Sequence, residues 1–141
     1  GVFAYVEPQF DANAFDGIRR VIDVSGDGPN NMGLPVEMAR EPLIRSGVTI
    51  NGLPIMIKRA GGFASISNLD TYYEDCVIGG PGAFLIPVTS AGQFAQAIRR
   101  KLVLEIAGLA PQVIPAAATG ERPKRIDCLI GEKLREQMMR E

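Results

Sequence analysis

The stretch Arg20-Val21-Ile22-Asp23-Val24-Ser25-Gly26-Asp27-Gly28-Pro29-Asn30-Asn31-Met32-Gly33 decides the fold of this chain. A short apolar run ends abruptly in a loop of Gly, Asp, Asn and Pro, and a helix-like pattern begins at Pro35. The continuous apolar character of residues 18–24 predicts a strand that is buried on both faces of a parallel sheet. Asp27 then lies in a tight turn at the carboxyl end of this strand. Because ligands of open α/β sheets bind in the crevice outside that edge, we place the candidate site at this turn.

The composition restricts the kinds of protein to consider. The chain has 141 residues, of which 46% are hydrophobic and 22% are charged, as in an ordinary globular domain. A formal net charge of -1 does not favour binding to nucleic acid, and no apolar run reaches the length of about 18 residues that predicts a membrane span. Without histidine, this chain alone cannot form a Ser-His or Cys-His catalytic pair. Two cysteines are too few for a structural zinc site, which leaves a disulfide or two free thiols.

Further elements are predicted beyond the first strand. In chain order they are a helix over 35–47, a strand that starts at Val48 and ends near Leu53, a loop at Gly61-Gly62, a short helix over 68–76, a third strand over 83–88 and a helix that begins after Ser90 and ends before Gly108. Pro87 cannot donate a backbone hydrogen bond, which places the third strand at a sheet edge. We assign residues 1–110 to an α/β domain and residues 111–141 to a linker and C-terminal tail with a short helix.

The last helix of the domain has two distinct faces in the sequence. The apolar side chains at helical spacing predict the face that packs on the core: Phe94, Ile98, Leu102 and Ile106. The basic run Arg99-Arg100-Lys101 is expected to face solvent.

The first strand needs a neighbour that the predicted elements do not supply. In a sheet of only these three strands, the strand at 18–24 would have one unpaired edge although it is predicted to be the most buried. Folded proteins avoid such an exposed edge. We therefore expect three strands and flanking helices that form the C-terminal half of a doubly wound, mainly parallel, Rossmann-like α/β sheet. The strand at 18–24 would then be covered by an absent N-terminal half or by another subunit of an oligomer.

Four blocks of the sequence carry a resemblance to a known family. They are Arg19-Arg20-Val21-Ile22-Asp23-Val24-Ser25-Gly26-Asp27-Gly28-Pro29-Asn30-Asn31, Gly47-Val48-Thr49-Ile50-Asn51-Gly52-Leu53-Pro54-Ile55, Tyr72-Tyr73-Glu74-Asp75-Cys76-Val77-Ile78-Gly79-Gly80-Pro81-Gly82-Ala83-Phe84 and Ile98-Arg99-Arg100-Lys101-Leu102. Together they resemble the second half of a bacterial family of uncharacterised exported proteins that are built on a von Willebrand factor type A (VWA) domain. The resemblance implies a sheet with the strand at 18–24 near its middle and the strand at 83–88 at its edge.

The resemblance also implies a metal site. Such domains typically hold Mg²⁺ in a metal-ion-dependent adhesion site that is formed by three loops, and the turn around Asp27 resembles the third loop. The other two loops would lie upstream of Gly1, so the Mg²⁺ site would be incomplete in this chain, with Asp27 as its ligand. The residues expected to line it are Ser25, Gly26, Gly28, Asn30 and Asn31, with the alternative that Asn30 and Asn31 only shape the loop. Asp23 is then a buried carboxylate that needs a hydrogen bond or an Arg partner.

Three other interpretations of this turn stay open. Asp27 can be a turn residue that caps the following helix. The stretch Asp23-Val24-Ser25-Gly26-Asp27 superficially resembles the first loop of the metal site, although Asp stands where that loop has its last Ser. The glycine-rich turn could cradle a phosphate, but no Lys follows in the P-loop pattern.

We expect a non-enzymatic, exported binding domain that recognises an unidentified protein partner through this metal. The alternatives are a metal- or Asp-dependent hydrolase or phosphotransferase that uses Asp27, and a structural assembly subunit without metal. Cys76 and Cys128 each follow Asp and precede an apolar pair and Gly. We predict that they form a disulfide that ties the tail to the irregular loop, with two buried free thiols as the alternative. A disulfide fits an oxidising, exported location, namely the periplasm of a Gram-negative bacterium.

Overall fold

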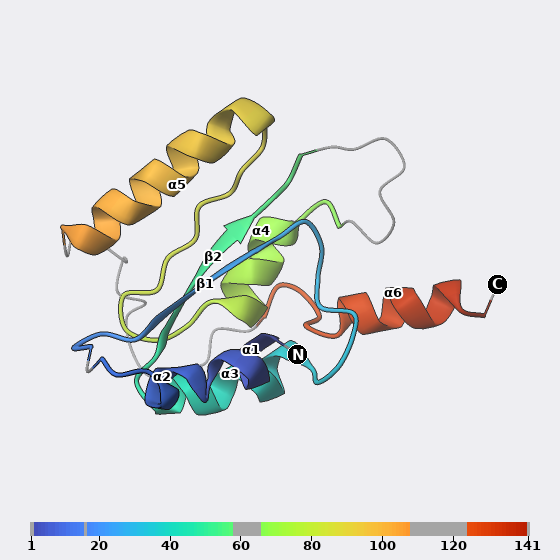
Figure 1. The fold of residues 1–141 in the computed structure, drawn as a ribbon. Coiled ribbons are helices and arrows are strands. Elements are labelled where there is room, and N and C mark those ends of the chain that lie inside the picture. The colour runs from blue at the N-terminus through green and yellow to red at the C-terminus, as the bar shows by residue number, and fades with distance from the viewer. Residues whose placement is uncertain (1, 16, 58–65, 108–123, 141) are drawn as a thin grey trace.

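The computed structural model describes residues 2–15, 17–57, 66–107 and 124–140, which form a mixed arrangement of helices and strands (Figure 1). The elements are α1 (Val2–Val6), α2 (Gln9–Ala12), β1 (Val21–Gly26), α3 (Val36–Arg45), β2 (Thr49–Pro54), α4 (Leu69–Tyr72), the π-helical turn η1 (Tyr73–Val77), α5 (Ala91–Ile106) and α6 (Ile130–Met138). Among the described helices, none combines the length and the apolar character that crossing a bilayer requires.

The sheet consists of two parallel strands joined by α3. β1 and β2 pair in register from Val21 opposite Thr49 to Gly26 opposite Pro54. After α3 the chain turns at Gly47, whose φ of 85° lies in the left-handed region that glycine adopts without a side-chain clash. The predicted order of strand, helix and strand is confirmed, although β1 starts three residues later than Ile18.

The burial of the two strands differs from the prediction. Every residue of β2 is buried, whereas Asp23 and Ser25 of β1 are exposed. Among the described residues β1 pairs with β2 alone, so its outer edge is open to solvent. The sequence predicted β1 as the strand that is buried on both faces, and this is wrong within the described structure: Ile22 and Val24 face the core, whereas Asp23 and Ser25 lie on the opposite face and are exposed.

Residues 84–88 lie along the other edge of β2 without forming a regular strand. Gly52 and Leu85 form an isolated parallel bridge, as do Ile55 and Val88. The N–H of Val88 donates to the carbonyl oxygen of Pro54 at 2.9 Å. Ile86 and Val88 donate to β2, so the nitrogen of Pro87 faces away from it; the ladder is interrupted because Pro54 of β2 lacks the N–H group that would donate to the carbonyl oxygen of Ile86. The predicted third strand is therefore reduced to bridges, and the described residues form a two-stranded sheet.

The core lies on one face of the sheet, against α1, α3, α4 and η1. Its buried members include Ile22, Val36, Leu43, Ile50, Leu69, Tyr72, Tyr73, Cys76 and Val77. Leu69, Tyr72 and Tyr73 all pack into this core and are buried. These contacts hold α4 and η1 beneath the carboxyl end of β1.

Helix α5 lies on the opposite side of the strands from α1, α2 and α3 (Figure 1), and it turns an unexpected face to the sheet. Ala97 and Lys101 are buried, whereas Phe94, Leu102 and Ile106 are exposed. The prediction that Lys101 faces solvent, and that the apolar stripe packs on the core, is therefore wrong in the described structure. The physical reason is electrostatic: carboxylates on the sheet and on α5 itself hold the ammonium group inward.

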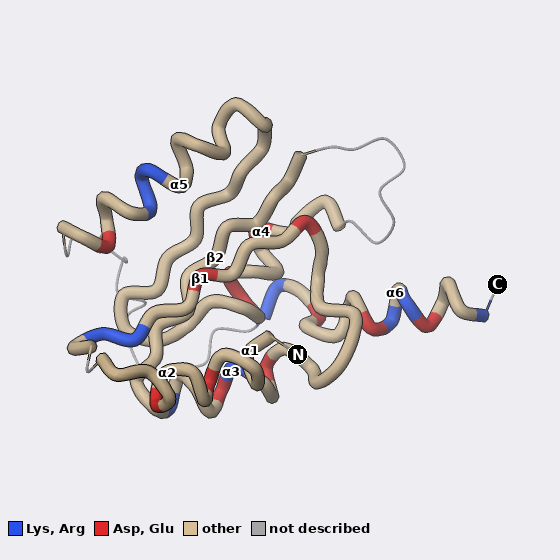
Figure 2. Tube along the Cα trace, in the orientation of Figure 1, with Lys and Arg blue, Asp and Glu red and all other residues tan. Residues whose placement is uncertain are grey.

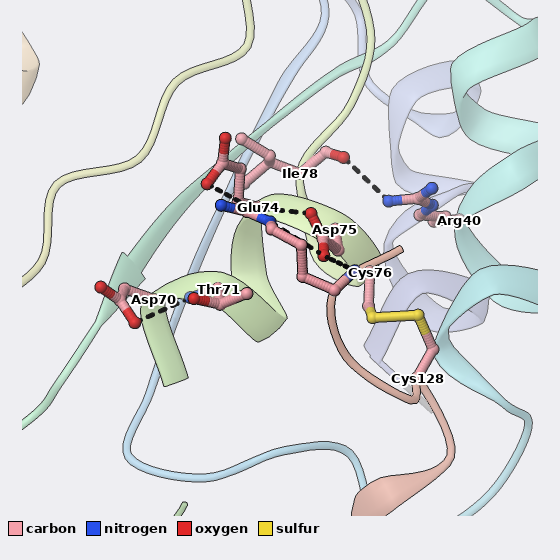
Figure 3. Close-up of polar contacts among 9 residues, drawn as sticks. Arg40, Asp70, Thr71, Glu74, Asp75, Cys76, Ile78 and Cys128 are labelled. Atoms are coloured by element: carbon pink, nitrogen blue, oxygen red, sulfur yellow. Dashed lines mark hydrogen bonds and ion pairs between the residues drawn. A yellow bond between two sulfur atoms is a disulfide. The ribbon is translucent and has the colours of Figure 1, made fainter. Parts of the chain in front are cut away.

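The C-terminal segment is fastened to η1. A disulfide joins Cys76 to Cys128 (Figure 3), so the predicted disulfide is present. Next to it the guanidinium of Arg125 pairs with Glu74 and Asp75, with Nη2 of Arg125 at 2.9 Å from Oδ1 of Asp75. Beyond the disulfide, α6 carries alternating acidic and basic residues (Figure 2). It lies within the range where a short final helix was predicted, while the predicted linker over 111–123 and the loop at Gly61-Gly62 fall outside the described residues.

Candidate functional site

Asp27 occupies the turn that directly follows β1, at the carboxyl edge of both parallel strands. It is exposed, and no described residue forms a hydrogen bond or an ion pair with its carboxylate. An unpaired carboxylate at this edge is free to accept donors or to bind a cation.

Tyr73 lies beneath this turn on the core face of the sheet. Burial raises the pKa of Tyr73 to about 12, and Tyr72 and the negative charge of Asp27 act in the same direction. A methyl group at Gly26 would lie only 2.9 Å from the Tyr73 hydroxyl oxygen, so glycine allows the ring to approach the strand. The phenol is therefore protonated at neutral pH and remains a hydrogen-bond donor.

Asn30, a predicted lining residue, connects three parts of the structure. Its backbone N–H donates to the hydroxyl oxygen of Tyr72 at 3.1 Å. Its side-chain Nδ2 donates to the carbonyl oxygen of Leu34 at 3.2 Å and to Oε1 of Glu132 at 2.6 Å. The side chain is therefore engaged in fixing the loop and not directed at a ligand beside Asp27.

Helix α6 packs directly on this loop. A Cβ at Gly131 would lie 2.0 Å from the backbone oxygen of Asn30, so only glycine permits the approach. Nη1 of Arg135 donates to the backbone oxygen of Asn31 at 3.2 Å. No motif in the sequence indicates this contact, because α6 and the loop are about a hundred residues apart in the chain.

Four of the five predicted lining residues border a cavity, and Asn31 does not. Ser25, Gly26, Gly28 and Asn30 line a cavity of about 190 Å³ on the core side of the turn. Asp27 is not among the residues that line it. The structure therefore places the carboxylate and this cavity on adjoining parts of one loop.

Asp23 is held apart from Asp27 by a pair with α5. Its carboxylate binds Nζ of Lys101 and accepts a weaker hydrogen bond from Nδ2 of Asn51 at 3.4 Å. Lys101 also contacts Glu105 at 2.9 Å. The predicted need for a partner is met by this Lys and not by an Arg. The prediction that Asp23 is buried is wrong, since its side chain is 36% exposed at the open edge of β1.

The pKa of Lys101 reflects these contacts. Burial lowers it, but hydrogen bonds and charge interactions with Asp23 and Glu105 outweigh the burial and raise the pKa above its ordinary value. The ammonium group is therefore charged at neutral pH and neutralises Asp23. Of the two carboxylates that the sequence singles out on β1 and its turn, Asp27 is the one without a cation among the described residues.

The described residues do not form a magnesium site by themselves. Within the described ranges, no group of three or more His, Cys, Asp or Glu side chains is placed to hold a metal ion. Mg²⁺ prefers near-octahedral oxygen ligands and keeps several waters, and Asp27 supplies one carboxylate.

The comparisons with known proteins identify a family and no function. The model of the family described as "Protein of unknown function (DUF1194)" matches residues 2–110. No curated protein and no solved structure matches the chain.

Proposed function

We propose that this chain, which belongs to the DUF1194 family whose description states no function, is a non-enzymatic binding domain. It recognises a partner through the Asp27 edge, by which we mean the carboxyl ends of β1 and β2 together with the turn that carries Asp27. The observation that carries the proposal is the contrast between two carboxylates. Asp23 is neutralised by Lys101, whereas Asp27 is exposed at the carboxyl edge of parallel strands. This edge is where α/β sheets bind ligands.

We propose that a divalent metal, with Mg²⁺ as the first candidate, joins Asp27 to oxygen ligands from a protein partner or from another part of the domain. The lack of a metal cluster among the described residues is consistent with one contributed ligand. The resemblance to the third loop of a VWA metal site supports the same assignment. In this proposal Asp27 binds and orients, and no chemical step is assigned to it.

We also propose that the complete sheet is a doubly wound, Rossmann-like sheet of the VWA type. The open edge of β1 supports it, because unpaired edges invite pairing with another strand. The apolar side chains of α5 that face solvent also support it, with Leu102 and Ile106 both exposed. A further strand and the helix that accompanies it would cover both features.

We further propose an exported, periplasmic location. The disulfide between Cys76 and Cys128 supports it, because such bonds form and persist in oxidising compartments.

Metal-dependent capture tests the proposal. The immobilised chain is incubated with a periplasmic extract in Mg²⁺ or in a chelator, and the retained proteins are identified. We expect a specific protein that is retained in Mg²⁺, is lost with the chelator and is lost in Asp27→Asn. Glu7→Gln is the matched control, since it removes one exposed carboxylate at the end of α1, away from the edge. Retention that is equal in the chelator and in Asp27→Asn contradicts the proposal, as does phosphoester turnover that Asp27→Asn abolishes.

A further inference from the structure

The cavity beneath the Asp27 turn has mainly apolar walls. Its volume is about 190 Å³. The apolar walls come from α1, β1, α3 and η1, and they include Phe3, Val24, Val36, Ala39 and Val77. Few polar groups interrupt these apolar walls. Small-molecule sites are built in this way, with a small number of polar groups that fix the orientation of the ligand.

Tyr73 supplies an available hydrogen-bond donor in this cavity. The residue is 3% exposed, and its ring lines the cavity. No described residue forms a hydrogen bond with its hydroxyl group. By contrast, the neighbouring hydroxyl of Tyr72 already accepts the N–H of Asn30. The Tyr73 hydroxyl oxygen is not among the described side-chain atoms that are both fully buried and unpaired, so it opens to the cavity and is available to donate a hydrogen bond to a ligand there.

The surroundings define the charge and size of that acceptor. No Lys or Arg side chain is among the lining residues, and the negative charge of Asp27 acts on Tyr73, so an anion is disfavoured. An apolar cavity of about 150 Å³ holds benzene, and the present cavity is somewhat larger. A single substituted ring therefore matches the available volume.

We propose that this cavity binds a neutral, ring-sized, mainly apolar molecule whose single carbonyl oxygen accepts a hydrogen bond from the Tyr73 hydroxyl. The apolar body lies among the side chains of α1, α3 and η1, and the carbonyl points toward the end of β1. This binding does not depend on metal at Asp27, so it stands or fails separately from the proposed function.

Three probes of similar size test the proposal on the full chain. Acetophenone carries the carbonyl, ethylbenzene lacks it, and benzoate replaces it by a charge. Titrations are followed by amide chemical shifts in NMR spectra, in the presence of a chelator. We expect acetophenone to bind most tightly, with shifts centred on residues 24–30 and 73–77, and benzoate to bind most weakly.

Two variants and one control assign the hydrogen bond. Tyr73→Phe should weaken acetophenone roughly 3- to 10-fold, the range for one neutral hydrogen bond, and leave ethylbenzene unchanged. Gly26→Ala should weaken both neutral probes, because its methyl group would lie 2.9 Å from the Tyr73 hydroxyl oxygen. Tyr5→Phe is the matched control, since Tyr5 is 72% exposed and lies outside the cavity.

Several results would overturn the proposal. They are equal affinity for acetophenone and ethylbenzene, equal or tighter binding of benzoate, and an equal loss of both neutral probes in Tyr73→Phe. If Tyr73→Phe does not fold, the comparison of the three probes on the unaltered chain decides alone.

Discussion

The contact between α6 and the Asp27 loop gives the sharpest stability prediction. Replacing Gly131 by Ala places a methyl carbon 2.0 Å from the backbone oxygen of Asn30 and 2.8 Å from its carbonyl carbon. Backbone atoms cannot move aside as the end of a side chain can, so α6 must shift. The shift breaks the 2.6 Å hydrogen bond between Asn30 and Glu132.

The magnitude follows from three contributions. Losing a hydrogen bond to a charged group costs about 1.5–3 kcal/mol, and overpacking costs about 1–3 kcal/mol. The better helix propensity of alanine offsets about 1 kcal/mol. We expect the free energy of unfolding of Gly131→Ala to fall by roughly 1.5–5 kcal/mol.

Urea denaturation measures this change, and Gly92→Ala provides the control. Gly92 is the second residue of α5, as Gly131 is of α6, but a Cβ there would meet no atom within 4 Å. Gly92→Ala should therefore stabilise the protein by up to about 1 kcal/mol. If both variants are stabilised alike, α6 does not pack on the loop as described, and the reasoning is refuted.

Three other predictions concern the disulfide, the buried lysine and the buried tyrosines. Reduction of Cys76–Cys128, which joins residues 52 apart, should lower the free energy of unfolding by roughly 4 kcal/mol on the chain-entropy model; equal urea midpoints with and without reductant would contradict this. Lys101→Met should lower the free energy of unfolding by roughly 1–3 kcal/mol, a value reduced from that of a fully buried pair because Asp23 is partly exposed. Arg100→Met on the exposed face of α5 should change the free energy of unfolding little. Equal effects of the two substitutions would show that the pair with Asp23 contributes nothing. Burial raises the pKa of Tyr72 and of Tyr73 to about 12 from 10.0. Unfolding releases their protons at lower pH, so stability should fall between about pH 10 and 12, and the fall should be shallower in Tyr73→Phe; an identical pH profile would exclude a contribution from Tyr73.

The local elements could be predicted because their signals are local. Gly47 ends α3 since its backbone conformation suits glycine. Pro87 lies in an edge segment, and its nitrogen faces away from β2 because Ile86 and Val88 are the residues that donate to that strand. The disulfide followed from two similar short stretches around Cys76 and Cys128.

The errors arose where partners lie far apart in the chain. Periodicity assigned the apolar stripe of α5 to the core, but Lys101 lies inward because Asp23 and Glu105 surround its ammonium group. The continuous apolar run of β1 suggested burial on both faces, yet the face that carries Asp23 and Ser25 is exposed, and only the face of Ile22 and Val24 packs on the core. The position of Tyr73 under Gly26 follows from tertiary packing alone, because the two residues are far apart in the chain.

Binding of Mn²⁺, a paramagnetic substitute for Mg²⁺, tests the central claim about Asp27 most directly. In NMR spectra of the full chain titrated with Mn²⁺, we predict that amide signals of residues 26–30 broaden first. The broadening should disappear in Asp27→Asn and persist in Glu7→Gln. Broadening that is centred elsewhere, or that is unchanged in Asp27→Asn, would contradict the assignment of this carboxylate as the ligand at the sheet edge.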